Sequence, residues 1–194
     1  MEKIAALIKN KPEKICSIDA STNSMAFAIF DGEALKKFGK INFEGVNTYD
    51  KVRDSARKCV MFFAQYADQI DSIVIEHTVY MNSPKTAADL ALVQGSLLGA
   101  ATQNGIRIAG SINPIAWQTF VGNGKLTKEE KLKIRKDTPG KSESWYKNYE
   151  REFRKQRTIN VMNINYSINN NDNDIADAIG VGHYAINNWG KVDK

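Results

Sequence analysis

The chain has 194 residues, of which 42% are hydrophobic and 25% charged, and 27 basic against 22 acidic side chains give a net charge of +5. This length and composition suit one globular domain, while two histidines and two cysteines leave little material for a His- or Cys-based metal site or a Ser-His-Asp triad. No apolar stretch approaches the roughly 20 residues that span a bilayer, so we expect a cytoplasmic protein that does not bind membranes.

The first predicted element is an apolar strand that ends in a carboxylate. Residues 14–18 lead into Asp19, small polar residues follow, and a second apolar strand runs to Asp31-Gly32. The two runs predict an antiparallel hairpin. Because aspartate is unusual within a strand, Asp19 is a candidate functional residue. A turn aspartate that accepts backbone N–H bonds is the structural alternative.

The following elements predict an α/β sheet. Residues 35–43 form a third strand with the lysines of a sheet edge, residues 47–68 a helix, and residues 70–76 a strand that again ends in a carboxylate, Glu76. The uninterrupted apolar run before Glu76 is typical of a central strand covered on both faces. A helix at 85–104, a strand at 106–112 and a short helix from Pro114 follow.

A basic segment then precedes the last helix. From Asn123 to Thr158 there are 12 Lys or Arg and 6 Asp or Glu residues, in two predicted helices at 126–136 and 142–157. A basic segment on a near-neutral body favours a polyanion as partner, and a solvated pair of charged helices is the alternative. The candidate phosphate contacts are Lys125, Lys128, Lys131, Lys133, Arg135 and Lys136.

The last predicted helix, residues 174–186, carries Asp174 and Asp177 on one face. Helix capping and a favourable charge at a helix N-terminus are their structural alternatives. With Asp19 and Glu76 at the ends of neighbouring strands, a helix over the sheet could bring four carboxylates together. Oxygen ligands of this kind suit Mg²⁺ or Mn²⁺, and two such ions roughly 3.5–4 Å apart are a machinery for phosphodiester cleavage.

Four short motifs carry a resemblance to a known family. They are Ile18-Asp19-Ala20-Ser21-Thr22, Val74-Ile75-Glu76 with the later Ala88–Gly95 run, Trp117–Gly124, and Asp174-Ile175-Ala176-Asp177. In order and spacing the sequence resembles RuvC-type Holliday-junction resolvases of the RNase H-like superfamily, particularly bacteriophage members. The resemblance covers about residues 14–183.

The resemblance implies an RNase H-like α/β domain over residues 1–194, with a mixed five-stranded sheet flanked by helices and a basic helical insertion at 123–160. It implies a homodimeric, Mg²⁺-dependent endonuclease that nicks four-way DNA junctions, with Mn²⁺ as a plausible substitute. Asp19, Glu76, Asp174 and Asp177 would be the catalytic residues and would hold two metal ions per active site. Where bacterial relatives carry a junction-wedging aromatic, this chain has Val79, with Tyr80 beside it as a candidate for stacking on unpaired bases.

Three alternatives to a junction resolvase differ in what they require. A catalytically inactive, structure-selective DNA-binding protein would keep the basic segment and bind without metal. An RNase H-like nuclease of another specificity would use the same carboxylates on other branched nucleic acids. An actin- or Hsp70-like ATPase would need a duplicated domain, for which 194 residues leave no room.

Overall fold

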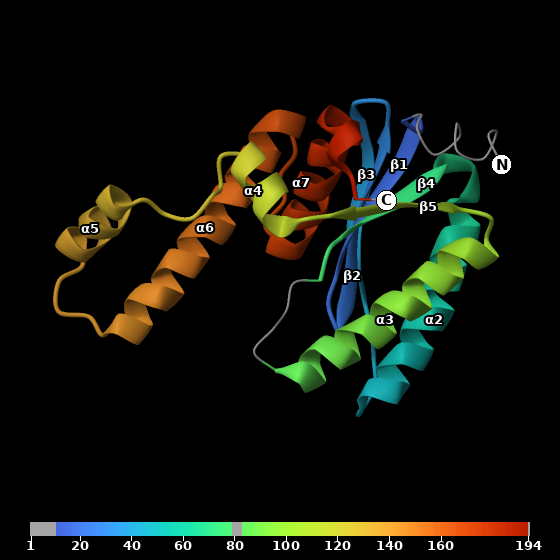
Figure 1. The fold of residues 1–194 in the computed structure, drawn as a ribbon, viewed down its shortest axis with the longest axis horizontal. Helices are drawn as coiled ribbons and strands as arrows, with labels where there is room; N and C mark the ends of the chain where they lie inside the picture. The colour runs from blue at the N-terminus through green and yellow to red at the C-terminus, as the bar shows by residue number, and fades with distance from the viewer. Residues whose placement is uncertain (1–10, 79–82, 194) are drawn as a thin grey trace.

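The computed structural model of the protein describes residues 11–78 and 83–193 and contains a five-stranded sheet (Figure 1). Its strand order is β3-β2-β1-β4-β5, with antiparallel pairing among β1, β2 and β3 and parallel pairing of β1 with β4 and of β4 with β5. The mixed five-stranded sheet expected from the sequence is therefore confirmed. The strands are β1 (Lys14–Ala20), β2 (Ser24–Asp31), β3 (Ala34–Asn42), β4 (Ser72–Glu76) and β5 (Arg107–Ile112).

Helices cover both faces of this sheet (Figure 1). Apolar side chains alternate along the central strand β1, so that Cys16 and Ile18 face one helical layer while Ile15 faces the other. The first layer holds α2 (Thr48–Gln65) and α3 (Pro84–Gln103), and the second holds α4 (Pro114–Phe120), α6 (Glu143–Tyr166) and α7 (Asn173–Asn187). Also helical are α5 (Lys128–Asp137) and the 3₁₀ turns η1 (Ala67–Gln69) and η2 (Trp189–Lys191).

The helix α5 and the outer half of α6 project away from the sheet as an arm, which we define as residues 126–157 (Figure 1). Its two helices are joined by polar contacts: Arg135 donates two hydrogen bonds to the Glu143 carboxylate, at 2.6 and 2.7 Å, and the Tyr146 hydroxyl donates one to the Thr138 carbonyl at 2.6 Å. The two helices expected here are present. The second one, however, ends at Tyr166 and not near Arg157, because Ile159 and Met162 continue it into the core beside α7.

At Gly182 the helix α7 lies so close to the sheet that no side chain would fit between them. The buried Ser17 hydroxyl on β1 donates a hydrogen bond to the Ala178 carbonyl of α7 at 2.7 Å. A Cβ atom on Gly182 would lie 2.5 Å from that hydroxyl oxygen and would overlap the ring of Phe30. Glycine at this position therefore fixes the height of α7 above the sheet, and with it the position of the carboxylates near its N-terminus.

Among the residues that the structure describes, no helix combines the length and the apolar character needed to cross a lipid bilayer. The two cysteines, Cys16 and Cys59, are buried and unpaired, as the sequence indicated.

The close approach of α7 generates a stability prediction. We expect Gly182→Ala to lower the free energy of unfolding by about 2 kcal/mol, because the added methyl group overpacks the contact with Ser17 and Phe30. Gly190→Ala in the turn η2 is the control, since a Cβ there meets nothing within 4 Å, and it should change stability by less than about 0.5 kcal/mol. Urea unfolding measures both; equal effects of the two substitutions would contradict the prediction.

Candidate active site

Two carboxylates meet at the ends of the parallel central strands. Ile18 of β1 pairs with Ile75 of β4, so the next residues along each strand, Asp19 and Glu76, are neighbours on the face that α7 covers. The two carboxyl groups lie close enough for the charge on Glu76 to disfavour ionisation of Asp19 and raise its pKa.

The N-terminal turn of α7 brings the other two carboxylates to the same place. Asp174 and Asp177 lie one turn apart, and both line a pocket together with Asp19 and Glu76. The cap of this helix is Asp172, whose carboxylate accepts hydrogen bonds from the Asp174 and Ile175 amides. Capping therefore does not account for Asp174, whose side chain is left for another role.

Burial and mutual repulsion alter the acidity of this cluster. Burial, with the nearby Glu76 charge, raises the pKa of Asp19 well above its usual range. Burial likewise raises the pKa of Asp177, to which Asp19 and Asp174 add repulsion. Burial and the Asp177 charge raise the pKa of Glu76 to about 7. Negative charge at this point of the fold is costly, and a cation would relieve the cost.

Trp117 positions one member of the cluster. Its ring is fully buried between α4 and α7, and its indole N–H donates to Glu76 Oε1 at 3.3 Å. A Cβ on Gly180 would lie 2.6 Å from this ring, so α7 again packs on it without an intervening side chain. The tryptophan at the start of the Trp117–Gly124 motif thus orients the Glu76 carboxylate.

The opposite wall of the pocket is basic. Its cations are Lys125 and Lys131 together with Lys147, Arg151, Arg154 and Lys155 of α6. Arg154 and Lys155 are close enough to Asp177 to favour its ionised form. The pocket is thus lined by carboxylates and by cations, and such a site attracts divalent cations and an anionic ligand together.

A polar junction holds this wall in place. The Asn123 side-chain amide donates to the Arg154 carbonyl at 2.9 Å and to the Thr158 hydroxyl at 2.6 Å. Arg154 in turn donates to Gln118 Oε1 at 2.7 Å. The hydrogen bonds of the Gly122-Asn123-Gly124 turn therefore fix which face of α6 is turned toward the carboxylates.

Comparison with known proteins identifies the fold. No protein-family model matches the sequence, and no curated protein matches it. Two solved structures from Thermus thermophilus do: RuvC in complex with a Holliday junction substrate, with TM-score 0.64 and 10% sequence identity, and RuvC alone, with TM-score 0.62 and 11% identity. Each match covers 93% of this chain and 98% of the RuvC chain. The chain has a RuvC-like fold.

Within this RuvC-like fold, the four carboxylates predicted from the sequence line one pocket, but only some of the predicted phosphate contacts do. Lys125 and Lys131 are part of the pocket wall. Lys128, Lys133 and Lys136 are exposed on α5 and do not line it, and Arg135 is engaged by Glu143. Val79 and Tyr80 lie outside the described residues.

Sequence reasoning missed five cations near the carboxylates. Four of them are the α6 residues of the pocket wall, whose spacing of three and four residues from Lys147 to Lys155 was a usable signal for a common helix face. The fifth is Lys40 on β3, whose ammonium lies 2.5 Å from Asp174 Oδ2 and 3.1 Å from Asp172 Oδ2.

The donor chemistry of the pocket fits Mg²⁺ or Mn²⁺, but the side chains are not yet arranged as a cage. Across residues 11–78 and 83–193, no three Asp, Glu, His or Cys side chains are already grouped to hold a metal ion. The reason is visible in their partners: Glu76 accepts from the Trp117 indole, while Asp174 accepts from Lys40 and Asn173. Cation binding would have to exchange these partners, and all four candidates supply the oxygen ligands such ions prefer.

The raised pKa of Glu76 predicts how stability depends on pH without divalent metal. Between its usual value of 4.5 and about 7, the folded protein holds a proton that the unfolded chain has lost. The free energy of unfolding should therefore fall as pH rises through this range, by about 3 kcal/mol at roughly 1.4 kcal/mol per pKa unit.

Urea unfolding in EDTA between pH 5 and 8 measures this fall. Glu76→Gln, which cannot ionise, should reduce the fall, and the part that remains would come from Asp19 and Asp177, whose pKa values are also raised. The exposed control Glu129→Gln on α5 should keep the whole fall. A wild-type slope in Glu76→Gln would show that another group carries the pH dependence.

Proposed function

We propose that this protein is a metal-dependent endonuclease that cleaves four-way DNA junctions. The observation that carries the proposal is the pocket in which Asp19, Glu76, Asp174 and Asp177 lie beneath the cations of α6. A phosphodiester is an anion whose hydrolysis by this route needs divalent cations, and the pocket offers donors for both. The match to a RuvC that was solved with a Holliday junction substrate supports branched DNA as the substrate class.

In this proposal the four carboxylates hold the metal ions and the chain supplies their orientation. Divalent ions bound there would activate water and stabilise charge on the attacking and leaving oxygens. Trp117 aims the Glu76 carboxylate through its N–H, and the close packing of α7 on β1 sets the height of Asp174 and Asp177. Burial raises the pKa values of Asp19, Glu76 and Asp177, and metal ligation requires ionised carboxylates, so metal binding should release any protons that these groups hold.

The cations have a separate role, which is to bind backbone phosphates. Lys147, Arg151 and Lys155 follow one face of α6 toward Asp177, so a DNA strand bound along them would be led to the carboxylates. The exposed lysines of α5 and Tyr80 are proposed as further DNA contacts. Phosphate contacts position the duplex and carry no sequence information, so selectivity for a junction comes from its shape.

Paired cutting of a four-way junction requires two active sites, and we propose a homodimer on that ground. The face of α3 that is turned away from the sheet supports close approach of a second chain. Cβ atoms on Gly95 and Gly99 would meet nothing within 4 Å, and Leu92 on the same helix is 47% exposed.

The first test is cleavage of a labelled four-way junction by the Asp177→Asn variant. We expect the rate to fall by a factor of about 10² or more, because one ligand charge is lost. Binding in EDTA should stay equal or become tighter, since the neutral amide repels phosphate less. The control Asp68→Asn in the exposed turn η1, which does not line the pocket, should change neither.

The outcome separates the alternatives. Metal-dependent, paired nicks on the junction but not on a matched linear duplex support a resolvase. Equal cutting of flaps and forks would indicate a nuclease of broader specificity. Binding without cleavage in either Mg²⁺ or Mn²⁺ would indicate a DNA-binding protein and contradict the proposal.

The second test removes the α6 cations, as Lys147→Ala, Arg151→Ala and Lys155→Ala combined. Affinity for all DNA forms should fall, and the slope of log affinity against log salt should decrease by about 2 to 3, since each phosphate contact contributes about 0.9. Arg53→Ala with Arg57→Ala is the control, because these two arginines are 83% and 70% exposed on α2 and do not line the pocket. Fluorescence anisotropy at several salt concentrations gives the slopes, and equal slopes for both variants would remove α6 from the interface.

A further inference from the structure

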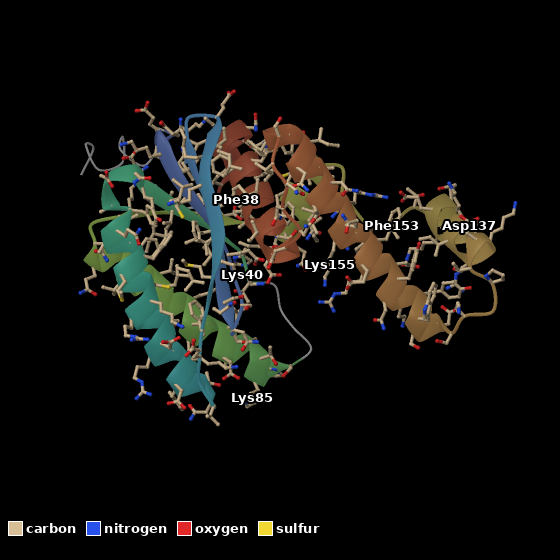
Figure 2. The ribbon with its side chains drawn as sticks, turned by 180° about the vertical axis from the view of Figure 1, so that it is seen from behind. Phe38, Lys40, Lys85, Asp137, Phe153 and Lys155 are labelled. Carbon is tan, nitrogen blue, oxygen red and sulfur yellow. The ribbon has the colours of Figure 1, made fainter. Side chains whose placement is uncertain are left out.

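One lysine crosses the sheet to reach the candidate metal ligands. Lys40 of β3 pairs with Ala26 of β2, which pairs with Asp19 of β1, so the three residues form one row on the α7 face. Because the middle residue has only a methyl group, the long Lys40 side chain can pass over it toward the N-terminal end of α7. Figure 2 labels Lys40 on β3 and Lys155 on α6.

At the end of this path the ammonium of Lys40 contacts Asp174. The distance from Nζ to Asp174 Oδ2 is 2.5 Å, and a second contact of 3.1 Å reaches Asp172, the helix cap. Oδ1 of Asp174 accepts from the Asn173 side chain at 2.7 Å. Both oxygens of this carboxylate are thus engaged by donors of the chain, and only one of those donors is charged.

These contacts give Asp174 partners of a different kind from the partner of Glu76. Glu76 accepts a hydrogen bond from the neutral Trp117 N–H, whereas Asp174 forms an ion pair with a lysine that is itself 24% exposed. An ammonium and a divalent cation cannot both take the same carboxylate oxygen at full strength, since each repels the other. Asp174 can therefore ligate a divalent cation through Oδ2 only if Lys40 moves away.

We propose that Lys40 is the counter-ion that Asp174 exchanges for a divalent cation. The proposal rests on the proposed function, because it takes Asp174 as a metal ligand. Lys40 holds the Asp174 carboxylate in place at the pocket when metal is scarce, and it lowers the apparent affinity of the site for metal. Lys40 is a positioning residue in this scheme, and its effect is on cation binding before any substrate is present.

The test is Mn²⁺ binding to the full chain, measured by electron paramagnetic resonance without DNA. Lys40→Met keeps the length of the side chain and removes the charge, and it should bind Mn²⁺ about tenfold more tightly than the wild type. Lys40→Arg retains the charge and should stay within about threefold of the wild type. Lys36→Met is the matched control on the same strand, where the lysine is 53% exposed and pairs with Asp31, and it should bind as the wild type does.

Unchanged or weaker binding by Lys40→Met would overturn the proposal, as would an equal gain in Lys36→Met. To test whether Lys40 acts through Asp174, Lys40→Met is repeated in an Asp174→Asn background. There the increase in Mn²⁺ affinity caused by Lys40→Met should shrink to threefold or less. A full tenfold gain there would mean that Lys40 acts on the site as a whole and not through Asp174, which also overturns the exchange. The proposed function fails separately, if the wild type binds Mn²⁺ no better than Asp177→Asn does.

Discussion

Mutual repulsion among carboxylates is the constraint on which this structure depends. The sheet brings Asp19 and Glu76 together at adjacent strand ends, and the glycines of α7 allow Asp174 and Asp177 to approach them. Asp19, Glu76 and Asp177 are buried deeply enough to raise the free energy of their ionised forms. The fold can keep four acids in one place only by giving each a partner, and the choice of partners explains much of the surrounding structure.

Those partners divide the cluster into two halves. In the strand half, Glu76 accepts a hydrogen bond from the Trp117 N–H, which is a neutral partner. The helix half depends on charge, from Lys40 on one side and from Arg154 and Lys155 on the other. A protein that kept acids here for structural reasons alone would gain by replacing them with apolar residues. The retention of all four supports a role in binding cations.

The sequence predicted the positions of the acids better than those of the bases, for a physical reason. Asp19 and Glu76 each follow a recognisable apolar run at the end of a strand. Asp174 and Asp177 are three residues apart, and this spacing places them on one face of any α-helix. The place of Lys40 depends on the register of β3 against β2, which shifts at an irregularity near Ile29 and Phe30. A slip of one residue would turn Lys40 to the opposite face, and local sequence does not determine that register.

The α6 cations show the same limit for a helix. The sequence predicted a basic helix, but the face that it presents is set by the hydrogen bonds of Asn123 and Arg154, which join residues about 30 positions apart. The length of this helix was also underestimated, because Ile159 and Met162 extend it by packing on α7. Tertiary contacts decided both features.

The arm holds itself together with the same kind of charge that it offers to a ligand. Lys131 pairs with Glu150, Arg135 with Glu143 and Arg157 with Glu130, and these side chains are exposed or only partly buried. Dissolved salt screens such pairs over the same range of concentrations in which it competes for phosphates. Rising ionic strength would therefore loosen the packing of α5 on α6 and at the same time weaken the binding of a polyanion. Because the two effects act together, a plot of log affinity against log salt should steepen as the salt concentration rises and should not stay linear.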